Sequence, residues 1–271
     1  MTDRPSSRYL ADTAPQLHLL EWGKEDAPPV ILLHGAAQHA GVWEPVASYL
    51  PGFRLVALDA RGHGRSDPAS DYGVEAYVGD LGRVVHALGR PVALVGHSTG
   101  ALVAMQFAAR FPALVWAAAF LDIDPRPRDS QRDRLREAGS RPPRRFTSVE
   151  EVVAGIERIT PGISPAIARR LAETGYEQVE SGAYRHRLDP RTLADYPQFD
   201  NWPALPAITC PALVGRGEES TVSSHDAAEE AVRLLPRGRL EMLPGGHQLH
   251  LQHPERLAAA LAAFLAPHRP A

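Results

Sequence analysis

The segment Gly96-His97-Ser98-Thr99-Gly100 constrains the fold of this chain more than any other. An apolar run at residues 91–95 precedes it, and an alanine-rich run at residues 101–109 follows it. This order predicts a buried strand, a sharp turn and a helix, with the serine at the tip of the turn. We call residues 96–100 the serine turn. Such a tight turn strains its central residue and requires small residues two positions before and after it, and the two glycines meet that requirement.

The predicted position of Ser98 suits a nucleophile. Its hydroxyl would stand at a helix N-terminus, where the helix dipole and the free N–H groups favour negative charge. The alternative is an ordinary glycine-bounded turn with an exposed serine. The strand before the turn and the helix after it favour the nucleophile.

The rest of the chain alternates between apolar runs and amphipathic segments, which predicts an α/β fold with a mostly parallel sheet and helices on both faces. We expect strands at 17–22, 30–33, 53–58, 91–95, 116–121, 211–215 and 240–243, and helices at 42–50, 74–88, 101–109, 225–235 and 254–265.

This alternation is interrupted at residues 125–205, where arginine and proline are frequent and no strand is clear. Helical patterns occur at residues 149–159 and 166–173. A structureless loop of this length is rare in a compact domain, so we predict an inserted helical lid between two core parts at 1–124 and 206–271. We interpret its arginines as a solvated basic face, and attraction of an acidic substrate is the alternative.

Composition narrows the classes of partner. The formal net charge is −3 and no long basic run occurs, so we expect no nucleic-acid partner. Cys210 is the only cysteine, which rules out a disulfide within the chain. Residues 1–16 lack the apolar core of a secretory signal, and no segment is long enough to cross a bilayer. We therefore expect a cytoplasmic protein whose partner is a small-molecule substrate. The sequence does not indicate an oligomeric state.

A serine hydroxyl needs a base within hydrogen-bond reach, and the base needs an orienting group. In α/β proteins with this serine turn the chain order is serine, acid, histidine, so the base lies downstream of Ser98. His247 is favoured because it follows a predicted strand in the flexible loop Pro244-Gly245-Gly246-His247. Its ordinary pKa suits a general base, and a surface histidine is the alternative. The other downstream histidines are His186, His225, His250, His253 and His268.

Two backbone N–H groups are expected to bind the negative oxygen that forms during such a reaction. One is the N–H of Thr99, directly after the nucleophile, and the other is that of Ala36 in the loop after residues 30–33. His34, His39 and His63 lie in separate loops without a metal-ligand spacing, so we predict no metal site.

Four sequence landmarks together resemble those of the α/β-hydrolase superfamily, over about residues 17 to 265. They are His34-Gly35, Asp59-x-Arg61-Gly62-x-Gly64-x-Ser66, Gly96-x-Ser98-x-Gly100 and Gly246-His247. The resemblance implies an eight-stranded, mostly parallel sheet, a helical cap over the site and no cofactor. It also implies that residues 59–67 form a structural loop rather than a catalytic one.

The chain departs from that family at the acid. The family's usual slot lies three residues past a glycine, after the strand that follows the lid, and here Ser220 occupies it. Glu218 or Glu219 could serve from beside the slot. Some superfamily members place the acid after the preceding core strand instead, where this chain has Asp122 and Asp124. We favour Asp122, for which capping of the first lid turn is the alternative role.

These residues predict hydrolysis of a carboxylic ester or lactone through an acyl-enzyme, with Ser98 attacking, His247 moving the proton and Asp122 orienting His247. A serine at the turn argues against the haloalkane dehalogenases and epoxide hydrolases of this superfamily, which use aspartate there. The alternatives are a carbon–carbon bond hydrolase of a diketone acid and a slow-turnover, ligand-sensing protein. The sequence does not identify the substrate.

Overall fold

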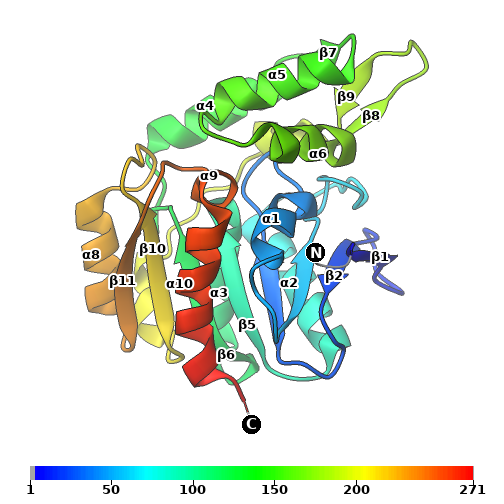
Figure 1. The fold of residues 1–271 in the computed structure, drawn as a ribbon. Coiled ribbons are helices and arrows are strands. Elements are labelled where there is room, and N and C mark those ends of the chain that lie inside the picture. Colours follow the sequence, from blue (N-terminus) through cyan, green and yellow to red (C-terminus); the bar gives the residue numbers. More distant parts are fainter. Residues whose placement is uncertain (1–3, 271) are drawn as a thin grey trace.

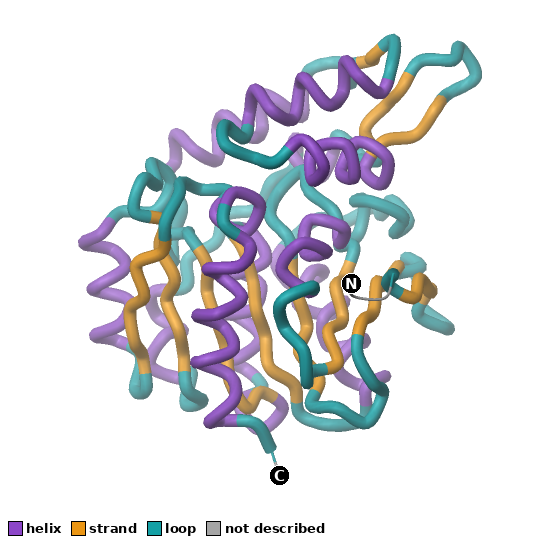
Figure 2. The backbone as a smooth tube through the Cα atoms, in the orientation of Figure 1, coloured by secondary structure: helices purple, strands orange, loops and turns teal. Residues whose placement is uncertain are grey.

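The computed structural model describes residues 4–270, so residues 1–3 and 271 of the predicted core parts lie outside the described residues. Its main feature is an eight-stranded sheet in the order β1-β2-β4-β3-β5-β6-β10-β11 (Figures 1 and 2). β2 is antiparallel to both of its neighbours, and the other neighbouring pairs are parallel. The predicted α/β fold is therefore confirmed. The strands are β1 (Ser6–Tyr9), β2 (His18–Trp22), β3 (Pro29–Leu33), β4 (Arg54–Leu58), β5 (Val92–His97), β6 (Val115–Leu121), β10 (Ala212–Gly217) and β11 (Gly238–Leu243).

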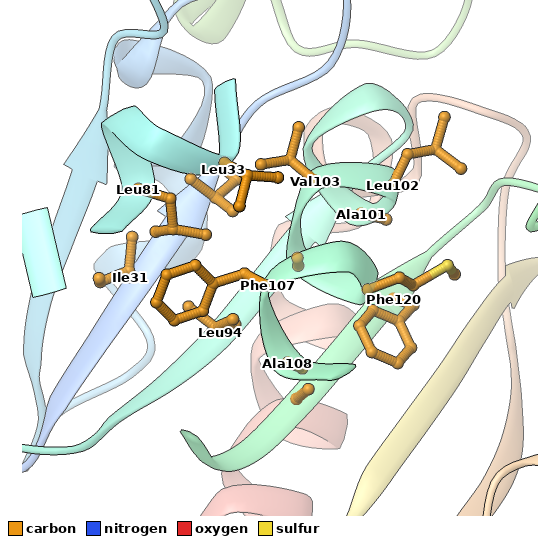
Figure 3. Packing of buried hydrophobic residues seen from close by; sticks show 14 of the residues in the cluster. Ile31, Leu33, Leu81, Leu94, Ala101, Leu102, Val103, Phe107, Ala108 and Phe120 are labelled. Atoms are coloured by element: carbon orange, nitrogen blue, oxygen red, sulfur yellow. The ribbon is translucent and has the colours of Figure 1, made fainter. Parts of the chain in front are cut away.

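Helices cover both faces of this sheet, which explains the continuous apolar runs of its central strands. Side chains alternate across the sheet, so Ile31 and Leu33 join one buried cluster while Val30 and Leu32 join the other. Figure 3 shows part of the first cluster, where side chains of α3 pack with those of β3 and β5. The helices of the first face are α2 (Val74–Leu88), α3 (Thr99–Arg110) and α8 (His225–Leu234), and those of the second are α1 (Glu44–Ala47), α9 (Leu249–Gln252) and α10 (Pro254–Leu265).

The segment between β6 and β10 lies over the carboxyl ends of the parallel strands (Figure 1). We call residues 125–205 the cap segment, and its function as a lid stays a prediction. Its elements are α4 (Asp129–Ser140), β7 (Arg145–Phe146), α5 (Val149–Ile159), α6 (Pro165–Gly175), β8 (Tyr176–Gln178), β9 (Tyr184–His186) and α7 (Arg191–Ala194), and the 3-10 helix Trp202–Ala207 follows at its end.

One helix and four strands differ from the sequence-based expectation. α4 was not expected, and neither was the three-stranded sheet β7-β9-β8. Only Gly139 of α4 is buried, so that helix has no apolar periodicity to detect. The edge strand β1 also escaped prediction, because its Ser-Ser-Arg-Tyr sequence is largely exposed and has no apolar run. Within residues 4–270, no helix is both long and apolar enough to cross a membrane.

Candidate active site

The backbone of the serine turn is strained as its sequence predicts. β5 ends at His97 and α3 begins at Thr99, which leaves Ser98 between them with φ 51° and ψ −120°. Positive φ is unfavourable for a residue with a side chain and persists only where surrounding structure enforces it. A Cβ at Gly96 would lie 2.4 Å from the carbonyl oxygen of Gly100, and one at Gly100 would lie 2.3 Å from that of Leu33. Both positions therefore require glycine.

Ser98 opens into a pocket between the core and the cap segment. His247, Gln38 and Gln248 line this pocket from the core, and α4 lines it from above. Within residues 4–270 the Ser98 hydroxyl oxygen makes no hydrogen bond to another residue. The nucleophile candidate and the base candidate thus share one pocket, and the serine hydroxyl is free to interact with a ligand there.

His247 lies in the loop between β11 and α9, and Asp122 fixes its ring from behind. The Nδ1–H of His247 donates to Oδ2 of Asp122 at 2.7 Å. The histidine side chain is 25% exposed, whereas the Asp122 side chain is fully buried. This contact leaves Nε2 of His247 as the nitrogen that can accept a proton.

Asp122 is held at the end of β6 by several donors. Its backbone has φ 53°, which turns the chain abruptly after the strand. Oδ1 accepts from the backbone N–H of Gly217 at 2.9 Å, and Oδ2 accepts from the Ser220 hydroxyl at 2.6 Å as well as from His247. Ser220 thus fills the family's usual acid slot and donates to the carboxylate on the neighbouring strand. These contacts fix the orientation of the Asp122 carboxylate.

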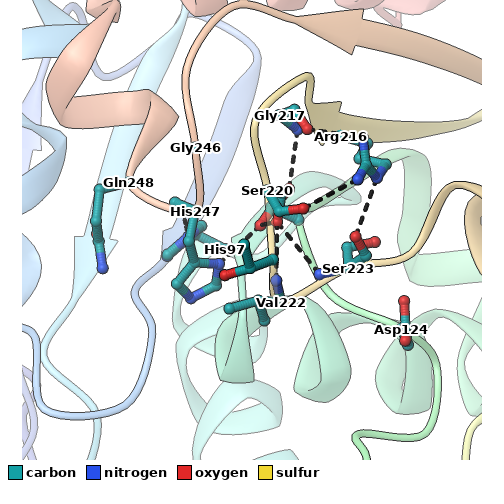
Figure 4. A network of polar contacts seen from close by, with 12 residues as sticks. His97, Asp124, Arg216, Gly217, Ser220, Val222, Ser223, Gly246, His247 and Gln248 are labelled. Atoms are coloured by element: carbon teal, nitrogen blue, oxygen red, sulfur yellow. Dashed lines mark hydrogen bonds and ion pairs between the residues drawn. The ribbon is translucent and has the colours of Figure 1, made fainter.

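None of the other candidate acids hydrogen-bonds to His247 within the described part of the chain. Asp124 accepts from the backbone N–H of Ser224 at 2.9 Å, and burial raises the pKa of its carboxyl group. Glu218 and Glu219 are exposed. Figure 4 shows Ser220 beside His247 and Asp124 apart from it. The structure therefore brings Asp122, and not Asp124, Glu218 or Glu219, into contact with the candidate base.

The two candidate oxyanion donors are available for a ligand. The backbone N–H groups of Ala36 and Thr99 donate to no other group within residues 4–270. The loop that carries Ala36 is held by Gln38, whose Oε1 accepts from the N–H of Gly35 at 2.8 Å. The Nε2 of Gln38 in turn donates to Oε1 of Gln248 at 2.7 Å. These contacts connect the loop after β3 with the loop that carries the candidate base.

The His97 side chain, next to the nucleophile candidate, faces the site. It lines the same pocket as Ser98, and its Nε2–H donates to the backbone carbonyl of His247 at 2.7 Å. Burial, together with the nearby His250 and His247, lowers the pKa of His97 well below its ordinary value. A neutral His97 thus supports the backbone of the candidate base.

The histidines considered as metal ligands are engaged elsewhere. The Nδ1–H of His34 donates to the carbonyl of Gly35 at 2.8 Å, and its Nε2 accepts from the N–H of Ala60 at 3.0 Å. The described residues contain no group of three or more His, Cys, Asp or Glu side chains placed to hold a metal ion.

Residues 30–260 match the model of the alpha/beta hydrolase family. The chain belongs to the α/β-hydrolase family. This α/β-hydrolase is 30% identical over 249 residues to a 2-(acetamidomethylene)succinate hydrolase of Mesorhizobium japonicum, covering 89% of each chain. It is 32% identical over 197 residues to lipase LipV of Mycobacterium tuberculosis, covering 72% of this chain and 69% of the relative. A crystal structure of E-2-(acetamidomethylene)succinate hydrolase superposes with a TM-score of 0.86 at 29% identity, over 97% of this chain and 99% of that one.

The loop at residues 59–67 of this α/β-hydrolase is built around Asp59. Its carboxylate accepts from the N–H of Ala40 at 2.6 Å, from the N–H of Arg65 at 2.9 Å and from His18 at 2.7 Å. Burial alone would raise the pKa of Asp59, but the hydrogen bond from His18 and the neighbouring histidines lower it to about 2. The carboxylate thus organises the loop, and it does not line the Ser98 pocket.

Sequence analysis missed three residues around the site. Ser220 was named only as the residue that replaces the usual acid, although its position in the acid slot could have indicated contact with the neighbouring carboxylate. Gln38 belongs to no sequence motif that would indicate a role at the site. Tyr196, near the end of the cap segment, lines the Ser98 pocket, and its hydroxyl lies 2.8 Å from Oγ1 of Thr99. A single sequence cannot show that contact, because the two residues are 97 positions apart.

Proposed function

We propose that this α/β-hydrolase cleaves a carboxylic ester or a lactone of a small molecule through an acyl-enzyme. The observation that carries the proposal is the 2.7 Å contact between the buried Asp122 and His247, in the pocket onto which the strained Ser98 opens. This arrangement matches the roles of acid, base and nucleophile in a serine triad.

In the proposed mechanism, Oγ of Ser98 attacks the substrate carbonyl carbon while Nε2 of His247 accepts the serine proton. Asp122 stabilises the resulting imidazolium, and the N–H groups of Ala36 and Thr99 bind the oxyanion. The imidazolium then gives its proton to the leaving alcohol oxygen as the carbon–oxygen bond breaks. Water, deprotonated by His247, attacks the acyl-enzyme and releases the carboxylic acid.

The relatives do not agree on a substrate, since one is named for a succinate derivative and another as a lipase. We therefore keep the proposal at the level of the ester or lactone bond. A small-molecule substrate and a cytoplasmic location stay predictions.

The decisive experiment compares the wild type with Ser98→Ala on 4-nitrophenyl butyrate. Removing the nucleophile leaves only residual catalysis from binding and the oxyanion donors, so we expect turnover to fall by at least about 10³-fold. A fluorophosphonate probe should label Ser98 in the wild type, as located by peptide mass spectrometry. Ser66→Ala, which removes a hydroxyl outside the pocket, is the control for nonspecific labelling.

Label on another serine, or near-normal turnover by Ser98→Ala, would overturn the mechanism. Stoichiometric labelling of Ser98 without turnover of any ester or lactone offered would instead favour a ligand-sensing protein. Turnover of diketone acids alone would favour carbon–carbon bond hydrolysis.

A further inference from the structure

The wall of the Ser98 pocket that faces the nucleophile from α4 is cationic. Arg132 and Arg134 line this wall together with Gln131 and Leu135. No Asp or Glu side chain lines the pocket among the described residues. The described residues that line this pocket therefore include two arginines and no acidic residue.

Arg134 differs from most arginines of the cap segment in having no partner. Arg132 is paired with Asp129 at 3.4 Å and with Asp133 at 3.2 Å. Arg134 makes no hydrogen bond or ion pair within residues 4–270, and it is exposed. The arginines of this segment that pair with a carboxylate are Arg126, Arg132, Arg141, Arg144, Arg169, Arg170, Arg185, Arg187 and Arg191.

α4 is anchored on both sides of Arg134, to the core before it and to the end of the cap segment after it, so this side chain is presented from a fixed helix. Before it, Arg128 donates to the carbonyl of Thr221 at 2.6 Å, and Gln131 donates to that of Val222 at 2.8 Å. After it, Arg136 donates twice to the carbonyl of Tyr196, at 3.0 and 2.8 Å. These contacts hold the helix over the pocket without using the Arg134 side chain.

A second cavity adjoins the Ser98 pocket and has a different character. It shares Gly35, Ala36 and Tyr196 with the Ser98 pocket. Its remaining wall is largely apolar and includes Leu33, Leu81 and Val103. The two cavities that share these residues therefore have unlike walls, largely apolar in one and arginine-bearing in the other.

From this asymmetry we infer that the substrate carries a carboxylate, which Arg134 binds while the reacting carbonyl lies at Ser98. A guanidinium presents paired N–H donors that match the two oxygens of a carboxylate, and Arg134 is the arginine of this wall whose donors are unused. The inference rests on the proposed function, because it names the substrate class of the same site.

The experiment uses two pairs of esters that differ only in a free or a methylated carboxyl group. The acyl-side pair is mono-4-nitrophenyl adipate and its methyl ester. The leaving-group pair is the hexanoate ester of 4-hydroxybenzoate and that of methyl 4-hydroxybenzoate. The quantity measured is the ratio of kcat/KM for the acid over that for its methyl ester, at low ionic strength, where charge effects are largest.

We expect the wild type to prefer the acid in at least one pair, and Arg134→Gln to lower that ratio about tenfold. Arg134→Lys keeps the charge without the planar donors, so its ratio should lie between those of the wild type and Arg134→Gln. The matched control is Arg158→Gln on α5, because Arg158 is exposed and lines none of the pockets around Ser98. Its ratio should equal that of the wild type.

A wild type without preference in both pairs, or an Arg134→Gln variant with an unchanged ratio, would overturn the inference. Failure of the inference is distinguishable from failure of the proposed function. If the neutral esters are cleaved by the wild type and not by Ser98→Ala, serine hydrolysis stands even where the carboxylate preference is absent.

Discussion

Asp122 connects three parts of the site, because it accepts hydrogen bonds from His247, Ser220 and the backbone of Gly217. Asp122→Asn replaces an acceptor by an amide that can hold the wrong tautomer of the histidine, so kcat should fall by orders of magnitude, as in the serine-protease template, where the loss is about 10⁴-fold. Asp122→Asn and its control Glu219→Gln are assayed on the same ester, and circular dichroism checks that each variant is folded.

Glu219→Gln is the matched control, since Glu219 is exposed beside the usual acid slot. It should change kcat by less than about tenfold, which is roughly 1.4 kcal/mol of barrier. If Glu219→Gln loses most of its kcat and Asp122→Asn keeps nearly all of it, the acid lies after β10 instead.

At the scale of single residues, sequence indicated the nucleophile and base candidates because each belongs to a short motif with a defined local geometry. For the acid, sequence favoured Asp122 and left Asp124, Glu218 and Glu219 as alternatives. What distinguishes these four in the structure is the positive φ of Asp122 and the hydroxyl of Ser220. The contact of Ser220 with Asp122 joins strands that are distant in sequence, so a single sequence does not show it. The catalytic roles of Ser98, His247 and Asp122 stay predictions.

At the scale of elements, the cap segment contains one connection that is exposed throughout. Residues 141–144, which connect α4 to β7, are exposed, whereas α4 is anchored through Arg128, Gln131 and Arg136. Proteases cleave exposed loops before anchored helices. Limited trypsin digestion should therefore cut first after Arg144 or Arg145, as read by mass spectrometry of the first fragments.

The control is the double variant Arg144→Gln/Arg145→Gln, which should lose this first cleavage and keep its activity. A first cut within β5, α3 or β6 would contradict the division into a core and a cap segment. Arg141 is no alternative site for trypsin, because Pro142 follows it.

Sequence predicted those cap elements that carry an apolar stripe. The pattern at residues 149–159 coincides with α5, and that at 166–173 lies within α6 (Pro165–Gly175). α4 escaped because Gly139 is its only buried residue. β7, β8 and β9 escaped because strands of two or three residues are too short for a pattern. Elements held by tertiary hydrogen bonds leave little trace in hydrophobic periodicity.

At the scale of the whole molecule, buried histidines make the stability depend on pH. Burial lowers the pKa of His34 and His250 to about 3 each. These groups stay neutral in the folded state but bind protons in the unfolded state below about pH 6.5. The free energy of unfolding should therefore decrease as pH falls from 6.5 towards 3, by up to about 1.4 kcal/mol per pH unit for each histidine. Urea unfolding at pH 7.5, 6.5 and 5.5 measures this slope.

His250→Asn tests the source of the slope. The substitution is expected to destabilise the protein at pH 7.5, because the ring packs against Trp43 and His97. Below pH 6.5, however, the free energy of unfolding should fall less steeply with pH, because the unfolded state takes up about one proton fewer. His225→Asn, at an exposed position on α8, should leave the slope as it is. An identical slope in all three proteins would contradict the assignment.

The fold class follows from sequence because strands buried on both faces are apolar throughout and alternate with amphipathic helices. The order of the strands does not follow from that alternation. In the structure Val30 lies between Leu55 on β4 and Ala93 on β5. Any other apolar strand would bury Val30 equally well, so the apolar pattern does not select these two neighbours. The number of strands was implied only by the resemblance to a family, since β1 has no apolar run.

The hydrogen bond between Ser220 and Asp122 bears on how a triad acid can change its place during evolution. The two residues follow neighbouring strands, and the Ser220 hydroxyl donates to the Asp122 carboxylate. An ancestor with acids at both positions need not have been inactive. Two adjacent carboxyl groups do not both ionise, so one keeps its proton and donates it to the other. A protonated acid at position 220 would donate as the Ser220 hydroxyl does now, and either acid could afterwards be lost without leaving the histidine unsupported.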